Sequence, residues 1–266
     1  MLSHKSLKMT FRMLLSMASL LAAIQPVLAH TSLEVPQIPE QKKSSNNIVI
    51  GHGCGESPVI GTSVVIPDGV DSTITTSTTQ AGGTDPYSGT VSDFLNWGNI
   101  IQLLQNRSVF SEQNEKIDSL GNVVGFWSGG GKGVSANLNA YIPFTINALF
   151  INSSSCAKSV RFDIAIVDVC KITPLSGVTD ETAVSLWTPA VGSKYDGVEG
   201  GHSFNNPAFL TINRDLTTNP LPDTCGEGLF VYVSPSAAQI DRDMPIIFDG
   251  TLINNSVKRL RPIMLR

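Results

Sequence analysis

The sequence is poor in basic side chains, and this shortage narrows the range of possible partners. Its 266 residues include 18 Lys and Arg against 22 Asp and Glu, for a formal net charge of −4. Proteins that bind nucleic acids or anionic membranes usually carry a basic excess. We therefore expect no nucleic-acid partner and no membrane-surface partner, whereas a modest acidic excess is compatible with metal cations.

Long apolar runs and familiar catalytic motifs are also missing. The most apolar stretch, residues 13–24, is much shorter than the roughly 20 residues that cross a bilayer. The chain contains no GxSxG elbow, no HExxH zinc pair and no CxxC. The glycine-rich stretch 128–133 lacks the first glycine and the Ser or Thr of a phosphate-binding loop. Nothing here supports a hydrolase or a dehydrogenase, and we expect a protein that is not an enzyme.

The amino-terminal residues have the pattern of a secretory signal peptide. Basic residues at positions 5, 8 and 12 precede the apolar run, and Val27-Leu28-Ala29 has the small-residue pattern of a cleavage site. We predict a signal peptide over 1–29 and a processed chain over 30–266 that begins at His30. Processing removes three basic residues and no acidic ones, so the net charge becomes −7. We expect a periplasmic or secreted protein with no membrane span after processing.

The four cysteines all lie in the processed chain, and an even number in an exported protein favours two disulfides. Residues 159–170 have the pattern of one continuous strand, which at about 3.3 Å per residue would hold Cys156 and Cys170 tens of ångströms apart. A disulfide needs Cα atoms within about 7 Å. We therefore expect Cys54 to pair with Cys156 or Cys170, and Cys225 to pair with the other.

Short β-type segments dominate the rest of the chain. Val160, Phe162, Ile164 and Ile166 alternate with other residues, which is typical of a strand with one buried face. Apolar residues at three- and four-residue spacings predict one helix over 91–104. We expect an all-β sandwich or barrel of one domain, 30–266, with a possible seam near 80–90. The expected strands are 48–50, 62–66, 73–79, 123–127, 140–151, 159–170, 183–187, 209–212, 229–233 and 245–248, with loops at 81–88 and 129–131.

Three histidines remain after processing, and the first would be the amino terminus. A terminal histidine offers its α-amine and its ring Nδ1 to one metal ion, and nitrogen ligands suit copper, which stands at the top of the Irving–Williams order. His52 and His202 lie in glycine-rich segments, which can approach a ligand closely. We predict a copper site at His30 with Glu56 as the carboxylate, and with His52 or His202 as a further ligand. The alternative interpretation is that both are ordinary loop histidines.

The amino-terminal third carries a resemblance to a known family. The segments His30-Thr31-Ser32-Leu33-Glu34, Ile50-Gly51-His52-Gly53-Cys54 with Ser57-Pro58, and Val64 to Val70 resemble the start of YcnI-like periplasmic copper-binding proteins. The resemblance covers about residues 29–70. It implies an immunoglobulin-like β-sandwich that binds Cu(II) through the terminal histidine and one acid, with a tryptophan nearby. His30 and Glu56 match that pattern, and Trp127 or Trp187 would supply the tryptophan. The predicted helix and the cysteine-bearing carboxy-terminal half depart from it.

Three functions from different classes remain open. The first is a copper chaperone or sequestering protein that exchanges Cu(II) with another periplasmic or membrane copper-handling protein. The second is a structural or interaction sandwich that holds no metal. The third is a copper-dependent oxygenase in which His52 or His202 completes a pair with His30. An oxygenase that attacks a flat polymer needs exposed aromatic residues, and the 7% aromatic content gives no sign of such a face.

Overall fold

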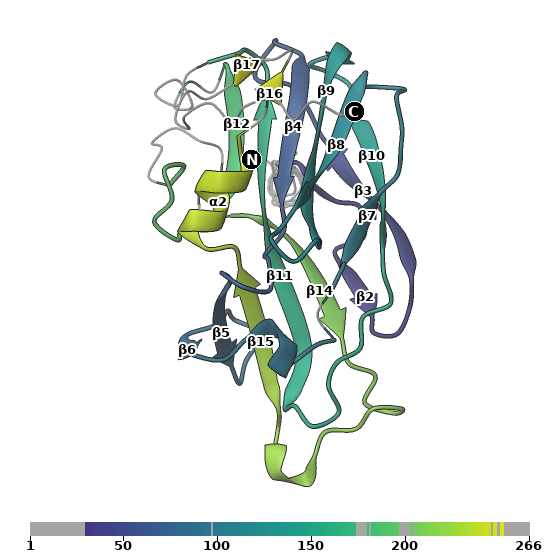
Figure 1. Cartoon of the computed structure of the whole chain (residues 1–266), viewed down its shortest axis with the longest axis vertical. Coiled ribbons are helices and arrows are strands. Elements are labelled where there is room, and N and C mark those ends of the chain that lie inside the picture. The colour runs from purple at the N-terminus through teal and green to yellow at the C-terminus, as the bar shows by residue number, and fades with distance from the viewer. Residues whose placement is uncertain are drawn as a thin grey trace, which may run out of the picture.

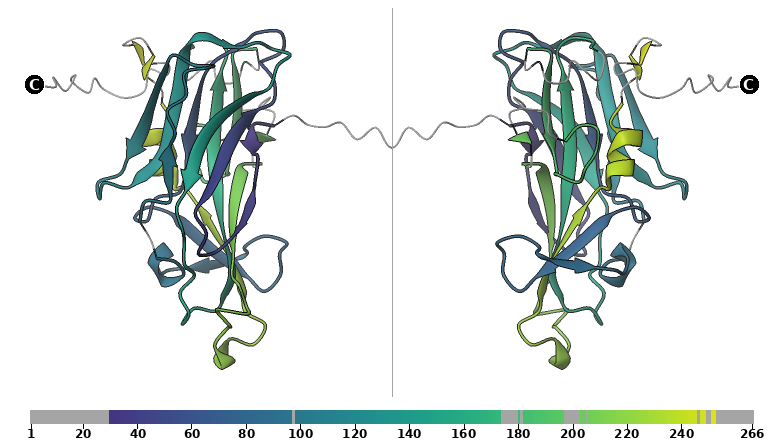
Figure 2. Two further views of the ribbon diagram at one scale, coloured as in Figure 1. Left: turned by 90° about the vertical axis from the view of Figure 1, so that its right-hand side faces the viewer. Right: turned by 90° about the vertical axis from the view of Figure 1, so that its left-hand side faces the viewer.

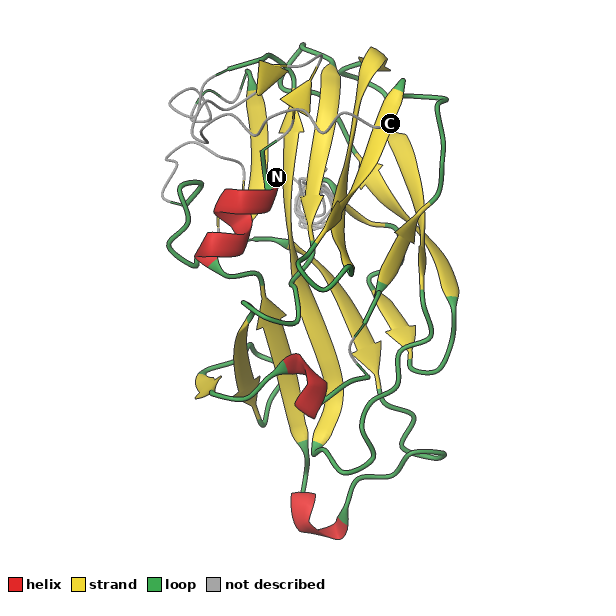
Figure 3. Ribbon diagram, viewed as in Figure 1, coloured by secondary structure: helices red, strands yellow, loops and turns green. Residues whose placement is uncertain are grey.

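The computed structural model describes residues 30–96, 98–173, 180, 182–196, 203–204, 206–245, 247–248 and 251–252. These residues form an all-β sandwich with one α-helix and two disulfides, as the sequence predicts (Figures 1 and 3). The helical elements are η1 (Val91–Asp93), η3 (Asp223–Cys225) and α2 (Ala237–Asp243). The strands are β1 (Ser32–Leu33), β2 (Gln37–Pro39), β3 (Ser44–Ile50), β4 (Val59–Val65), β5 (Thr73–Ser77), β6 (Asp85–Tyr87), β7 (Ile101–Leu103), β8 (Glu112–Ile117), β9 (Val123–Val134), β10 (Ala140–Ile146), β11 (Ala157–Val169), β12 (Val184–Thr188), β13 (Ser203–Phe204), β14 (Ala208–Asn213), β15 (Leu229–Ser234), β16 (Ile247–Phe248) and β17 (Thr251–Leu252).

The long strand β11 organises the larger of the two main sheets, and β16 and β17 pair separately as a two-stranded sheet. Its first half pairs with β14 and, in parallel, with β15, while its second half pairs with β4 and β12. The sheet continues through β9 and β8 at one end and through β5 and β6 at the other. The smaller sheet has the order β1-β3-β10-β7. Figure 1 shows β11 running along the axis of the molecule, so both halves of the large sheet depend on one strand.

The main hydrophobic core lies between the two sheets. Alternate residues of β11, including Val160, Phe162, Ile164 and Ile166, are buried there, as the period-two pattern predicts. They belong to the same apolar cluster as Ile48 and other inward residues of the smaller sheet. Burial of such aliphatic and aromatic side chains is the dominant favourable contribution to folding, at about 25 cal/mol per Å² of apolar surface.

Helix α2 covers the outer face of the large sheet, but only over the second half of β11. Ile240 and Met244 pack with outward residues such as Val65 and Val167 in a second apolar cluster. Figure 2 shows α2 on the side of the large sheet that is turned away from β3. The first half of β11 shows a different pattern on the same face, because its outward residues are polar. The outer face of the first half of β11 therefore lies outside the second apolar cluster.

The helix predicted over 91–104 is not formed. Only Val91–Asp93 turns, as the 3₁₀ helix η1, and residues 101–103 form strand β7 against β10. Between η1 and β7, the backbone forms hydrogen bonds with the segment that follows β10. Asn96 N–H donates to the carbonyl of Phe150, and Asn147 N–H donates to the carbonyl of Ile100. Pairing with the smaller sheet thus replaced the intrahelical bonds that the apolar spacing predicted.

Two expected loops contain strands. Residues 85–87 of the predicted loop 81–88 form β6 against β5. The glycines at 129–131 do not interrupt the strand that begins at Val123, since β9 runs on to Val134. Gly130 and Gly131 have positive φ values of 77° and 69°, a conformation that glycine adopts without steric cost, so the strand bends here without ending.

Both disulfides agree with the prediction that one long strand keeps Cys156 and Cys170 too far apart to pair. Cys54 is joined to Cys170, and Cys156 is joined to Cys225. Cys156 and Cys170 lie at opposite ends of β11, which keeps them apart. The first bridge fastens the 51–57 loop to the end of the large sheet, and the second fastens η3 to the start of β11.

Candidate metal site

Strand pairing brings His30 and His52 to the same end of the sandwich. β1 runs antiparallel to β3, with Ser32 opposite Val49 and Leu33 opposite Ile48. His30 lies two residues before Ser32, and His52 lies three residues after Val49, so both follow the pair toward one end. This register places the 51–56 loop and residue 30 at the same end of the two strands.

Two neighbours hold the imidazole of His30, which is half-buried. Its Nε2 lies 3.0 Å from Nδ2 of Asn206, and its ring centroid lies 6.1 Å from that of Trp187 at an interplanar angle of 41°. A cavity of about 370 Å³ opens beside it, between the 30–36 segment and residues 206–209. The Asn206 contact engages Nε2, whereas a chelate with a terminal amine would use Nδ1.

Asp168 lies under this end of the sandwich and is fully buried. Thr31 donates its hydroxyl to Oδ2 of Asp168 at 2.5 Å, and Thr62, directly opposite Asp168 on β4, brings a second hydroxyl to the same carboxylate. Burial raises the pKa of Asp168 to about 6, while hydrogen bonds from Thr31 and Thr62 and the electrostatic effect of His52 act in the opposite direction. A buried carboxylate is costly unless polar groups or a cation offset its charge, and here two threonine hydroxyls do so in part.

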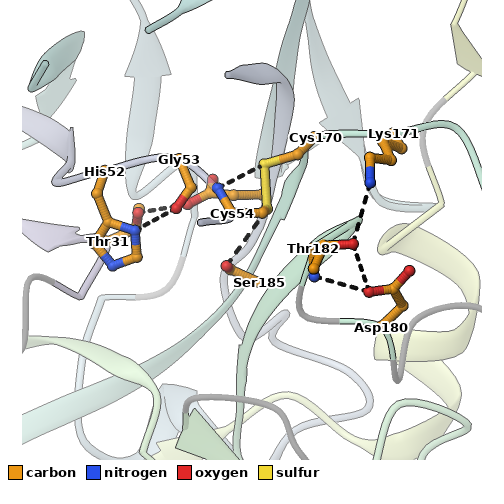
Figure 4. Close-up of a disulfide and its surroundings, with 10 residues drawn as sticks. Thr31, His52, Gly53, Cys54, Cys170, Lys171, Asp180, Thr182 and Ser185 are labelled. Atoms are coloured by element: carbon orange, nitrogen blue, oxygen red, sulfur yellow. Dashed lines mark hydrogen bonds between the residues drawn. A yellow bond between two sulfur atoms is a disulfide. The ribbon is translucent and has the colours of Figure 1, made fainter. Parts of the chain in front are cut away.

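The disulfide Cys54–Cys170 fixes the loop that carries His52. Cys54 exchanges two backbone hydrogen bonds with Ser57, and its N–H also donates to the sulfur of Cys170 at 3.1 Å. Figure 4 shows His52 and Gly53 on the loop next to the bridge. The Nδ1 of His52 is in close contact with the carbonyl oxygen of Gly53. The loop is therefore tied at its centre by the disulfide and by the backbone hydrogen bonds of Cys54.

The other predicted ligands are less closely tied to His30. Glu56 is exposed in the turn between Cys54 and Ser57, and its carboxylate forms no hydrogen bond or ion pair within the described ranges. His202 lies outside the described residues. In the described part of the chain, no group of three or more His, Cys, Asp and Glu side chains is placed to hold a metal ion. A terminal histidine supplies two donors from one residue, so a metal site built on it needs fewer than three such side chains.

Trp187, one of the two tryptophans that the resemblance leaves open, lies near His30. Trp187 is buried on β12 opposite Ile166 and approaches His30, and its indole N–H finds no acceptor among the residues described. Trp127 packs against the second apolar cluster, on the outer face of the large sheet. Of these two residues, Trp187 is the one beside the candidate site.

Sequence reasoning missed Asp168 and Asn206. The signal for Asp168 was present, because the alternation that buries positions 160 to 166 continues to 168 and places an acid on the inner face. An acid at an apolar position of a buried strand is uncommon unless it has a polar partner. Asn206 had no such signal, since it reaches His30 through the fold alone.

Comparison with known proteins leaves the chain unassigned. No protein-family model matches the sequence, and no curated protein matches it. Within the described part of the chain, no helix has the length and apolar character needed to cross a membrane.

Proposed function

We propose that the processed protein begins at His30, is exported to the periplasm or beyond, and binds one Cu(II) ion as a copper chaperone or sequestering protein. The α-amine and Nδ1 of His30 are the first two donors. The observation that carries the proposal is the setting of His30: Asn206 engages its other ring nitrogen, Trp187 lies beside it, and a cavity opens next to it.

The chemistry of the surroundings suits a cation. The buried Asp168 accepts the hydroxyl of Thr31, the residue after His30, and the register of β1 and β3 brings His52 to the same end of the sandwich. Glu56, the carboxylate expected from the resemblance to YcnI-like proteins, is exposed on the neighbouring loop. Two disulfides are typical of an oxidising compartment, which agrees with export.

The test begins with the exported protein. Mass spectrometry should give a chain that starts at His30, and electron paramagnetic resonance should show one Cu(II) ion with nitrogen and oxygen ligands. His30→Ala should abolish tight binding. A variant with one alanine inserted before His30 should do the same, because it keeps the imidazole and moves the amine. A processed chain with another first residue, or full affinity in the insertion variant, would refute the proposal.

The carboxylate ligand is tested separately. Glu56→Gln should weaken Cu(II) binding if Glu56 is a ligand, and Asp168→Asn should do so if the buried acid is the ligand. Unchanged affinity in both variants would leave His30 without a carboxylate partner and favour His52 as the third donor. No spectral change at stoichiometric copper would instead support a sandwich that serves as a structural module.

A further inference from the structure

A second cavity lies on the outer face of the large sheet, beyond the part that α2 covers. It has a volume of about 170 Å³, and its floor is formed by β14, β11 and β15, which lie side by side. Figure 1 shows these strands continuing below α2. Arg161 on the central strand lies opposite Tyr232 on one neighbour and opposite Thr211 on the other. The strand register thus builds this face from segments that are distant in the sequence.

Three aromatic rings on this face carry cations. Phe209, Phe230 and Tyr232 line the cavity and are half-buried. The ammonium of Lys158 lies 4.4 Å from the ring centroid of Phe230, and the guanidinium carbon of Arg161 lies 4.1 Å from that of Phe209 and 5.9 Å from that of Tyr232. The faces of aromatic rings attract cations, so the rings hold the two charged groups in place.

Asp163 holds Arg161 through a single nitrogen. Its Oδ1 accepts from Nε of Arg161 at 2.8 Å, and its Oδ2 accepts the hydroxyl of Ser234 at 2.9 Å, so both oxygens of the acid are engaged. The two terminal nitrogens of Arg161 carry four of the five N–H donors of a guanidinium, and they form no hydrogen bond with a described residue. The Arg161 side chain is 32% exposed, which leaves these donors accessible to a ligand.

The charge of this face is positive, although the protein is acidic. Lys158 and Arg161 are cations, and Asp163 offsets one of them, so the three groups leave a charge of +1. Lys158 forms no ion pair within the described ranges, and no acidic side chain lines the cavity among the described residues. A ligand with one negative charge balances this face. The two oxygens of a carboxylate also match the planar fork of a guanidinium.

The other polar groups of the cavity are amides and hydroxyls. Gln37 and Gln80 are exposed at its border, and the amide of Asn213 lies 3.5 Å from that of Gln37. Ser159 and Thr211 add hydroxyl groups from the floor. Amides and hydroxyls both donate and accept hydrogen bonds, so they match hydroxyl groups that a ligand carries beside its carboxylate.

We infer that this outer face binds a hydroxylated monocarboxylate of the sugar-acid type, either free or as a unit of a polymer. The terminal nitrogens of Arg161 donate to the carboxylate, Lys158 adds positive charge, and the amides of Gln37 and Gln80 bond the hydroxyl groups. The inference does not rest on the proposed copper function. Phe209, however, lines both this cavity and the one beside His30, so the test uses metal-free protein.

The experiment is calorimetric titration of the processed protein, freed of metal and dialysed into a Tris chloride buffer without carboxylate, phosphate or chelator. Galacturonate is the probe, and galactose is the matched sugar without the carboxylate. We expect galacturonate to bind at least tenfold more tightly than galactose, as one charge-assisted hydrogen bond predicts. No binding of galacturonate, equal affinity for the two sugars, or tighter binding of inorganic phosphate would overturn the inference.

Two variants at the site should change the affinity in opposite directions. Arg161→Gln keeps a long polar side chain but removes the charge, and should weaken galacturonate binding about tenfold or more. Asp163→Asn removes the opposing acid and should strengthen binding. Lys132→Gln is the control that matches Arg161→Gln in net charge, since Lys132 is exposed on β9, on the far side of β4 from β11. It should bind like the wild type.

Thermal unfolding establishes that each variant is folded before its binding is compared. Unchanged affinity in Arg161→Gln, or an equal loss in Lys132→Gln, would overturn the inference as well. Affinity electrophoresis in native gels with polygalacturonate then distinguishes the two sources, because only a site that accepts the polymer retards the protein. Since copper is absent throughout, failure here leaves the proposed copper site intact, and failure of the copper tests leaves this inference intact.

Discussion

Asp168→Asn should remove a pH-dependent loss of stability that the buried carboxyl imposes on the wild type. Burial raises the pKa of Asp168 from 3.8 to about 6, so the folded state holds its proton more tightly than the unfolded state does. As the pH rises through this window, the unfolded chain releases the proton first and the free energy of unfolding falls. Two pKa units at about 1.4 kcal/mol each give a loss of about 3 kcal/mol between pH 4 and pH 8.

The asparagine variant carries no titrating group at this position and can still accept the hydroxyl of Thr31. Urea unfolding in EDTA, followed by tryptophan fluorescence from pH 4 to pH 8, measures the difference between the two proteins. The free energy of unfolding of the variant minus that of the wild type should rise by about 3 kcal/mol between pH 4 and pH 8. Asp215→Asn is a control of opposite sign, because backbone hydrogen bonding lowers the pKa of the exposed Asp215. A flat difference for Asp168→Asn would refute the reasoning.

Three further changes test the fold. Replacing both Cys54 and Cys170 by alanine opens a link across 116 residues and should cost up to about 5 kcal/mol in chemical denaturation, and a cost below 1 kcal/mol would contradict its stapling role. Gly125→Ala should cost about 3 kcal/mol or more, because φ is 148° and a Cβ would lie 2.1 Å from a backbone oxygen, whereas Gly121→Ala, with open space around it, should cost clearly less. Ser236→Ala removes the cap of α2 and should lower the free energy of unfolding by about 1 kcal/mol, and an unchanged melting curve would count against that cap.

Local patterns predicted much of the secondary structure. The alternation along β11 and the β-type segments around Ile48, Val64, Leu210 and Val231 correspond to strands, because a half-buried strand imposes a period of two on its sequence. The predicted helix over 91–104 was wrong because pairing with distant residues replaced the local pattern. Its apolar spacing fits a helix, but hydrogen-bond partners from the smaller sheet, distant in the chain, were available to the same backbone.

The candidate site was likewise predicted only in part from local patterns. The expected cleavage pattern predicted His30 as a metal ligand, and the resemblance narrowed the nearby tryptophan to two residues. Asp168 contacts Thr31, and Asn206 contacts His30, each from a segment more than 130 residues away, and no local periodicity encodes such a contact. Glu56 and His52 remain predictions as metal ligands.

The chain by itself determined the class of fold, the exclusion of a Cys156–Cys170 bridge and the acidic balance, since each depends on composition or on neighbours along the backbone. Only the tertiary structure decided which tryptophan lies beside His30, which acid is buried beneath it, and that three scattered aromatic residues share one outer face. These contacts depend on strand register, because register fixes which distant side chains become neighbours. Register in turn depends on the packing of the whole sandwich.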